Sequence, residues 1–335
     1  NVGRILIHPD NNNILYAATS EGIYMTTNAG DTWDHLYTCK GNDMEFHPTD
    51  PLIIYVATRN EGITKIHRSI DGGASWQPGK LSVMGWRTEI AVSPDQPDWV
   101  YALAANYMDG LEGIYLSKNF GSTFDVLLDG SDTANNILTG ACVPNTILGG
   151  QGSYDLCITV NPANAEEVMI GGINLWKSYD AGQSWEITSM WTGTCENTVQ
   201  TVHADHHWLE FQYDSLNLFN CNDGGIYFSE DFGETWTDLT NGLFINQIYR
   251  ISNAQSVYNE SLFGTQDNGT RHWTGTEFYQ IGGGDGTDCL INKSDPDKQY
   301  FTNNGTLMKF TTDHWATTRN FSVTNDSAGS WFKAI

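Results

Sequence analysis

The sequence predicts an all-β protein, a seven-bladed β-propeller whose blades are four-stranded antiparallel sheets. Three observations predict it. One eight-residue pattern recurs five times, at intervals of 43, 48, 61 and 51 residues, the period expected of propeller blades with loops of different length. A turn containing proline or aspartate, followed by a short apolar strand, recurs seven times in the chain of 335 residues. The 34 glycines suit many short strands joined by tight turns.

The eight-residue pattern reads Ser-x-Asp-x-Gly-x-Thr-Trp and predicts the turn between the last two strands of a blade. Its Asp or Asn can accept hydrogen bonds from nearby backbone, its Gly is free to take a positive φ, and its Trp can pack beneath the turn. A remnant of the pattern stands at residues 312–315. We therefore predict structural roles, without catalysis or metal binding, for Asn28, Asp71, Asn119, Asp180 and Asp231.

The repeats divide residues 1–335 into seven blades of a single domain. The expected blades cover approximately residues 1–40, 41–84, 85–130, 155–195, 200–243, 244–283 and 284–335, with an insertion at 131–154. The end of the chain, residues 329–335, is similar to residues 85–91, the first strand of the third unit. This segment either closes the ring of blades or begins further repeats, so additional domains of a longer parent protein are among the expectations.

The charge excludes two classes of partner. With 16 basic and 40 acidic residues the net charge is −24, which repels phosphate backbones and anionic membrane surfaces, so we expect no nucleic acid and no membrane insertion. No stretch approaches the length of apolar chain that crosses a bilayer. The six cysteines allow up to three disulfides or buried free thiols; we favour disulfides, with Cys142 paired to Cys157, and a secreted or cell-surface location.

Polar residues gather in four segments, 202–208, 222–227, 264–270 and 282–286, near the ends of the inner strands of neighbouring units. Inner strand ends surround the channel of a propeller, so these side chains are expected at one mouth of it. Such a cluster can hold a divalent cation: carboxylate and carbonyl oxygens favour calcium, and histidines favour zinc. In a strand, three of the residues, His203, Asp205 and His207, would share one face. The expected ligands are His203, Asp205, His207, Asp223, Asp267 and Asp285.

The same residues have two other interpretations. Asp-Gly-Gly and Gln-Asp-Asn-Gly are turn sequences, whose carboxylates can satisfy backbone donors. Alternatively, two carboxylates across an open cleft can act as acid and base or nucleophile in glycoside hydrolysis, with Asp223 and Asp267 as the catalytic candidates.

The recurring pattern resembles the Asp-box superfamily, which includes sialidases, sortilin-type receptors and xyloglucan hydrolases. Residues 203–286 are similar to a signature of large secreted bacterial proteins that themselves resemble xyloglucan hydrolases or sortilin. This resemblance implies a propeller fold and export, and it indicates no particular activity. Where xyloglucan hydrolases carry a catalytic Asp in a Thr-Asp-x-Gly-Gly segment, this chain reads Thr-Ser-Glu-Gly-Ile at residues 19–23. None of its seven arginines has the Arg-Ile-Pro context of sialidases.

The function favoured by the sequence is a non-catalytic extracellular module that binds a glycan or protein ligand at the channel mouth. Exposed aromatic residues, Trp191, Trp208 and Trp273, are the expected contacts to that ligand. A glycoside hydrolase acting on polysaccharide and a structural component of a surface assembly are the alternatives.

Overall fold

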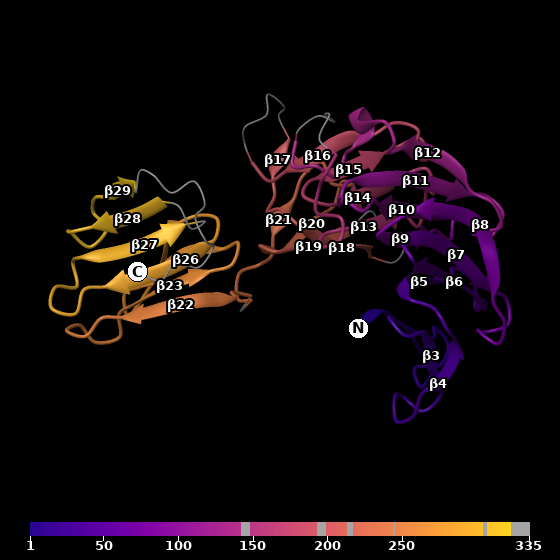
Figure 1. The fold of residues 1–335 in the computed structure, drawn as a ribbon, viewed down its shortest axis with the longest axis horizontal. Helices are drawn as coiled ribbons and strands as arrows, with labels where there is room; N and C mark the ends of the chain where they lie inside the picture. The colour runs from indigo at the N-terminus through magenta and orange to yellow at the C-terminus, as the bar shows by residue number, and fades with distance from the viewer. Residues whose placement is uncertain (142–147, 193–198, 213–216, 244, 304–306, 323–335) are drawn as a thin grey trace. The chain divides into compact units, whose positions relative to one another are not determined.

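A computed structural model describes residues 1–141, 148–192, 199–212, 217–243, 245–303 and 307–322. It shows seven antiparallel sheets, and the four strands of each follow one another in chain order across the sheet (Figure 1). One sheet carries a fifth, parallel strand. The predicted all-β, seven-bladed propeller is therefore confirmed. The chain divides into two compact units, residues 1–241 and 242–335.

The first unit contains five blades. Their strands are β1 (Val2–Ile7), β2 (Leu15–Thr19), β3 (Ile23–Thr26) and β4 (Asp34–Tyr37); β5 (Gly41–His47), β6 (Asp50–Asn60), β7 (Ile63–Ser69) and β8 (Gln77–Met84); β9 (Arg87–Val92), β10 (Val100–Ala105), β11 (Leu111–Ser117) and β12 (Asp125–Asp129); β13 (Cys157–Val160), β14 (Val168–Gly171), β15 (Leu175–Ser178), β16 (Glu186–Met190) and the parallel β17 (Gln200–Thr201); β18 (His206–Phe211), β19 (Leu218–Asn222), β20 (Gly225–Ser229) and β21 (Thr237–Asp238). A short 3-10 helix, η1 (Thr133–Asn135), follows β12.

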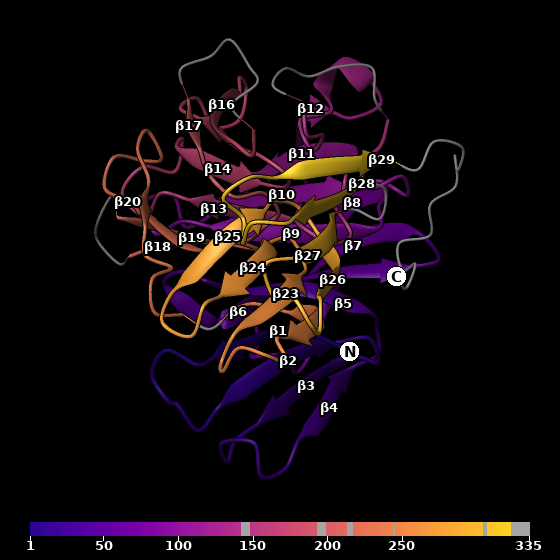
Figure 2. The ribbon, with the colours of Figure 1, turned by 90° about the vertical axis from the view of Figure 1, so that its left-hand side faces the viewer.

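The second unit contains two blades. Their strands are β22 (Ile248–Asn253), β23 (Ser261–Thr265), β24 (Gly269–Trp273) and β25 (Phe278–Gly282), then β26 (Gly286–Ile291), β27 (Gln299–Asn303), β28 (Leu307–Thr311) and β29 (Arg319–Ser322). Figure 2 shows β23, β24 and β25 side by side, as their pairing requires. Among the described residues no helix is long and apolar enough to span a membrane.

Each core lies between two consecutive sheets of one unit. Between the third and fourth blades the side chains of Leu103, Ile114 and Ile170 are completely buried. Leu262 and Phe301 fill the equivalent space between the two blades of the second unit. A blade therefore depends on its neighbour, because only the second sheet covers its apolar face.

The predicted turn is present in every blade that carries the pattern. In the fourth blade Asp180 Oδ1 accepts the backbone N–H of Ser184 at 2.9 Å and the hydroxyl of Ser178 at 2.8 Å. The Trp185 indole N–H donates to the carbonyl of Gly182 at 3.0 Å, and Gly182 has a φ of +85° that side chains disfavour. The same backbone bond to the Asp or Asn, at 2.8 or 2.9 Å, forms at Asn28, Asp71, Asn119 and Asp231.

The seventh blade contains more of this turn than its sequence indicates. Asp313 Oδ1 accepts the N–H of Thr317 at 2.9 Å and the hydroxyl of Thr311 at 2.7 Å. Trp315 occupies the glycine position with a φ of +66°. The turn thus keeps the hydrogen bonds of its carboxylate although it lacks the glycine and the final Trp, because the carboxylate and hydroxyl partners remain at the required spacing.

The expected Cys142–Cys157 disulfide is not found. Cys157 is a buried free thiol whose Sγ donates to the carbonyl of His206 at 3.4 Å, while Cys142 lies outside the described residues. Burial raises the pKa of the Cys157 thiol well above its usual range. The described cysteines Cys39, Cys221 and Cys289 are also free thiols. Cys157 begins β13 and points into the packed interface with the fifth blade, which explains why it is a core residue there.

We expect Asp180→Ala to destabilise the chain by about 1–3 kcal/mol, because several turn donors lose their acceptor. Asp180→Asn should cost less, since Asn28 and Asn119 fill the same position in other blades. Urea unfolding of both variants measures the difference. Equal losses in the two variants would contradict the assigned role of the acceptor.

Candidate functional site

The first strands of the five blades line a hollow in the first unit. Two cavities of about 460 and 470 Å³ lie along β1, β5, β9, β13 and β18. They share Arg4, Asp43, Glu89 and Trp208 in their walls, and the two cavities together are called here the inner hollow. Volumes of this order are typical of ligand pockets.

Charged residues alternate with apolar ones along the strands that line the inner hollow. Arg4 on β1 contacts both carboxylates of β5: its Nε lies 3.4 Å from Asp43 Oδ1, and its guanidinium is hydrogen-bonded to Glu45. On β9, Arg87 Nε donates to Glu89 Oε1 at 2.7 Å. The side chains of Asp43, Glu45 and Glu89 are only 3%, 21% and 14% exposed, so charge pairing is what makes their burial tolerable.

Burial perturbs these carboxyl groups strongly. It raises the pKa of Glu45 to about 8, although the charge of Arg4 opposes the change. Burial, followed by the charge of Asp43, raises the pKa of Glu89 to about 8. Burial likewise raises the pKa of Asp43, whose Oδ2 accepts the backbone N–H of Ile90 at 2.8 Å. The wall therefore carries less negative charge at neutral pH than its composition suggests.

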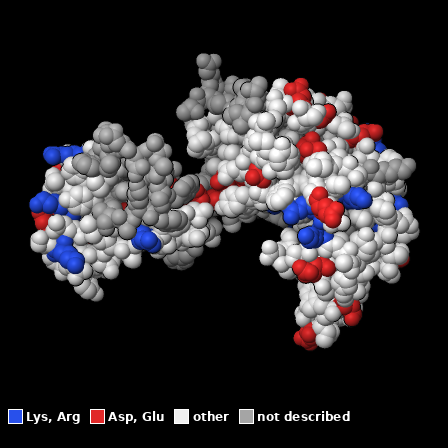
Figure 3. Space-filling model, in the orientation of Figure 1, with Lys and Arg blue, Asp and Glu red and all other residues white. Residues whose placement is uncertain are grey.

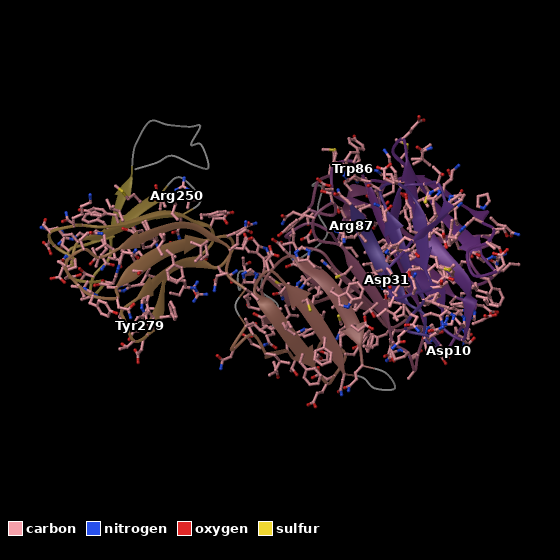
Figure 4. All side chains as sticks on the ribbon, turned by 90° about the horizontal axis from the view of Figure 1, so that it is seen from below. Asp10, Asp31, Trp86, Arg87, Arg250 and Tyr279 are labelled. Atoms are coloured by element: carbon pink, nitrogen blue, oxygen red, sulfur yellow. The ribbon has the colours of Figure 1, made fainter. Side chains whose placement is uncertain are left out.

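The rim of the inner hollow is basic and aromatic. Its wall includes Lys40 and Arg59 as well as Arg4 and Arg87. The guanidinium of Arg59 lies 4.0 Å from the centre of the Trp86 ring, and that of Arg4 lies 4.0 Å from the centre of the Trp208 ring. Figure 4 shows Trp86 and Arg87 next to each other on the first unit, and Figure 3 shows Lys and Arg atoms gathered on the face of that unit.

Four of the predicted metal ligands, His203, Asp205, His207 and Asp223, belong to the first unit, but they do not share one strand. β18 begins at His206, so His203 and Asp205 precede it, and Asp205 has a φ of +65°. The expected common face of His203, Asp205 and His207 is therefore absent, because the backbone turns before the strand begins. His206 is completely buried and its Nδ1 is 2.9 Å from Asn220 Oδ1.

Asp205 and Asp223 are nevertheless close together. Carboxylate oxygens of the two residues lie within 4.8 Å of each other, a spacing compatible with a shared cation. Each also has a partner from the segment before β13: Gln151 Nε2 donates to Asp205 at 3.1 Å, and the Tyr154 hydroxyl donates to Asp223 at 2.8 Å. His207 Nε2 lies 2.8 Å from the other oxygen of Asp223. The five groups thus form two hydrogen-bonded sets whose carboxylates lie close together, beside the start of β18 and the end of β19.

A buried acid beside these groups, Asp155, was not identified by the sequence analysis. Its carboxyl group contacts that of Asp205, and neither of its oxygens accepts a hydrogen bond from another described residue. Burial, followed by the charge of Asp205, raises the pKa of Asp155 to about 9. A carboxyl group with a pKa of about 9 is protonated at neutral pH, so Asp155 carries no charge there.

Asp267 and Asp285 belong to the second unit, where they build a turn. Asp285 Oδ1 accepts the backbone N–H of Asp267 at 3.0 Å, and Asp267 has a φ of +55°. Gly269, in the same turn, donates its N–H to the carbonyl of Gly284 at 2.7 Å. These contacts are those of the structural interpretation, in which a carboxylate satisfies a backbone donor. The catalytic candidates Asp223 and Asp267 thus lie in different units.

The three tryptophans expected to contact a ligand occupy separate places. Trp208 lines the inner hollow. Trp191 follows β16 and donates its indole N–H to the carbonyl of Gly140 at 3.1 Å. Trp273 is on β24 in the second unit, with its ring centre 4.4 Å from that of Phe278. Trp208 is the member of the set that faces the inner hollow.

The sequence analysis missed the charged wall itself. The available signal was the pair of charged residues two positions apart in otherwise apolar inner strands, Asp43 with Glu45 and Arg87 with Glu89. Alternation places both members of a pair on the same face of a strand. Which face meets the hollow is decided by how the blades are arranged, so the pattern alone did not distinguish this wall from a solvated surface.

No family model matches the chain, and comparison with known proteins shows that it is similar to β-propellers, xyloglucanases among them. An oligoxyloglucan reducing-end-specific xyloglucanase of Emericella nidulans is 24% identical over 202 residues, which are 57% of this chain and 22% of that enzyme. The chain therefore spans about a fifth of the length of the curated relative it matches.

Solved structures show the same fold at low identity. The GH74 xyloglucanase of Xanthomonas campestris superposes with a TM-score of 0.51 and 13% identity, covering 96% of this chain and 54% of the enzyme. PorZ, a surface component of the type-IX secretion system of Porphyromonas gingivalis, superposes with a TM-score of 0.50 and 13% identity, covering 98% of this chain and 40% of PorZ. The predicted resemblance to xyloglucan hydrolases is confirmed at the level of the propeller fold.

The Asp155–Asp205 contact predicts a pH dependence of stability. The pKa of Asp155 in the folded state, about 9, lies above its ordinary value of 3.8, so its contribution to stability is fully present below about pH 3.8 and is lost as the pH rises through about 9. Asp155→Asn does not titrate and can still donate a hydrogen bond to Asp205. We expect the thermal midpoint of the wild type to fall more steeply between pH 5 and pH 9 than that of Asp155→Asn.

The control for this measurement is Asp125→Asn, which alters an exposed carboxylate on β12. Its midpoint should follow the pH dependence of the wild type. If the thermal midpoint of Asp155→Asn also follows the pH dependence of the wild type, Asp155 does not carry the proton assigned to it.

Proposed function

We propose that the chain is a carbohydrate-binding propeller that holds an anionic polysaccharide segment at the rim of the inner hollow and does not cleave it. The observation that carries this proposal is the position of the cations. Three of the seven arginines, Arg4, Arg59 and Arg87, line one cavity together with Lys40, in a chain of net charge −24. Cations concentrated in a hollow of an acidic protein favour a ligand with negative charge.

The three arginines differ in how many of their hydrogen-bond donors already have a partner in the protein. Arg4 and Arg87 are paired with carboxylates of the wall, and Arg87 also donates to the carbonyls of Tyr154 and Leu156 at 2.9 and 3.0 Å. Arg59 forms no salt bridge with any residue that the structure describes, and it donates one N–H to the carbonyl of Trp86 at 3.1 Å. Its remaining donors are available for a planar carboxylate, which a guanidinium binds through two parallel hydrogen bonds.

The tryptophans beside the arginines favour a sugar. Trp86 and Trp208 are 43% and 38% exposed, and each carries a guanidinium over its ring. The part of each indole ring that remains exposed offers an apolar platform at low conformational cost, to which the C–H face of a pyranose ring is complementary. A uronic acid residue combines such a face with a carboxylate, so acidic polysaccharide is the ligand class that fits both features. Polymers of this kind occur outside cells, so the proposal includes a secreted or cell-surface location. The free thiols of the described cysteines do not add support for that location.

The test of this proposal is binding of an oligogalacturonate, with its methyl-esterified form as the uncharged comparison. We expect binding of the acidic form alone, weakened at least tenfold by Arg59→Ala, which corresponds to about 1.4 kcal/mol. Arg319→Ala, on β29 of the second unit, is the matched control and should leave the affinity unchanged. Titration calorimetry at low and high salt measures both variants. Equal affinity for the esterified form, or an unaffected Arg59→Ala, would contradict the proposal.

Glycoside hydrolysis is the second candidate function, favoured by one observation. Glu45 and Glu89 have pKa values raised to about 8 and both line the inner hollow, and a protonated carboxyl group at neutral pH is what a general acid requires. On the binding proposal we expect no release of reducing ends from oligogalacturonate or xyloglucan. Release by the wild type that Glu89→Gln abolishes, with binding retained, would establish the hydrolase instead.

A further inference from the structure

The second unit contains a cluster of metal-ligating side chains that lies far in sequence from the predicted site. Glu260 stands just before β23, His272 is on β24, and His314 belongs to the turn between β28 and β29. The three residues come from both blades of the second unit. Their ligand atoms all lie within 4.8 Å of one another.

The separations of these atoms fit a small metal ion. Glu260 Oε1 lies 2.9 Å from His272 Nε2 and 3.3 Å from His314 Nε2. In a tetrahedral zinc site, metal–ligand bonds of about 2.0–2.1 Å place neighbouring ligand atoms about 3.3 Å apart. The distance from Glu260 Oε1 to His314 Nε2 already has this value. A slight opening of the distance from Glu260 Oε1 to His272 Nε2 would give that pair the same value.

A second layer of hydrogen bonds fixes the carboxylate. Glu260 and Gln299 are 2% and 0% exposed, and Gln299 Nε2 donates to Glu260 Oε1 at 2.6 Å and to the carbonyl of Pro296 at 2.9 Å. The indole N–H of Trp315 donates to the amide oxygen of the same side chain, Gln299 Oε1. On the opposite side, His314 Nδ1 lies 3.4 Å from Asp297 Oδ1. A carboxylate behind a histidine ring orients that ring in many metal sites.

The turn that carries His314 adopts a costly backbone conformation. His314 and Trp315 have φ values of +55° and +66°, and glycine fills the position of Trp315 in the turns of the first unit, as at Gly182. A bulky side chain disfavours this region of backbone conformation. The residues equivalent to His314 are Ala29, Gly72, Phe120, Ala181 and Phe232, none of which ligates metal. The seventh blade thus departs from the repeat at the position that supplies a ligand and at the position that supports it.

We propose that Glu260, His272 and His314 form a transition-metal site, with zinc as the ion that best matches two imidazoles and one carboxylate. The set differs from the oxygen-rich cluster expected for calcium, because two of its three ligands are nitrogen. The site is open on one side, since the His314 side chain is 39% exposed while those of Glu260 and His272 are 1% and 3% exposed. A fourth ligand, water or a group of a bound molecule, enters from that side.

Metal binding changes the protonation of the cluster. The hydrogen atom between His272 Nε2 and Glu260 Oε1 must leave Nε2 when the ion takes both atoms, and a neutral imidazole then carries its hydrogen on Nδ1. A cluster that serves only as a buried hydrogen-bonded pair makes no such change, because added metal has no effect on it.

The experiment uses the whole chain, stripped of metal by a chelator and then titrated with Zn²⁺ by calorimetry and with Co²⁺ by absorption spectroscopy. We expect the wild type to take up one more equivalent than His314→Ala, with visible d–d bands of four- or five-coordinate Co²⁺ that this variant lacks. His35→Ala, which removes an exposed histidine on β4, should keep both the equivalent and the bands.

Two further variants separate ligation from folding. Glu260→Gln should lose the ion, and circular dichroism shows whether it remains folded. Asp297→Asn leaves all three ligands in place and should weaken binding at least tenfold, as loss of an orienting carboxylate does elsewhere. The same uptake and spectrum in the wild type and His314→Ala, or no Zn²⁺ uptake by the wild type, would overturn the assignment. Because the inner hollow contributes no ligand to this site, its failure leaves the proposed carbohydrate binding intact.

Discussion

The structure depends on burying the apolar faces of consecutive sheets against each other. No blade covers its own face, so the side chains of Leu103 and Ile170, and of Leu262 and Phe301, become core residues only when a second sheet lies against the first. In six of the seven sheets the last hairpin is closed by the repeated turn, in which a carboxylate or amide oxygen accepts the N–H four residues on.

The same stacking explains why charged residues occur in the inner hollow. The first strands of the five blades in the first unit border the hollow, and the side chains that line it can be polar provided that they are paired. Arg4 and Arg87 supply that pairing for Asp43, Glu45 and Glu89. Burial still raises the pKa values of the carboxyl groups, so the wall combines permanent positive charge with acids that are only partly ionised. The proposed binding of an anionic ligand at the rim rests on this balance.

The two sites also show how a repeat acquires specific chemistry. In the first unit, the segment before β13 contributes Gln151, Tyr154 and Asp155 to side chains at the start of β18 and the end of β19. In the second unit, the turn of the seventh blade substitutes a histidine and a tryptophan where other blades carry small or apolar residues and glycine. In both cases the framework of the blade is unchanged and a local departure from the repeat brings ionisable groups together.

The sequence by itself determined the all-β class, the number of blades and the turn residues, because these depend on local patterns: period, alternation and the spacing of Asp, Gly and Trp. It also identified Asp205 and Asp223 as residues near inner strand ends. The tertiary structure decided what these groups contact. It placed Asp267 and Asp285 in a turn of the second unit, left Cys157 as a core thiol, and revealed Asp155 beside Asp205 and Glu260 beside two histidines. These contacts join residues far apart in the chain, and their distances depend on how sheets stack, which no local pattern encodes.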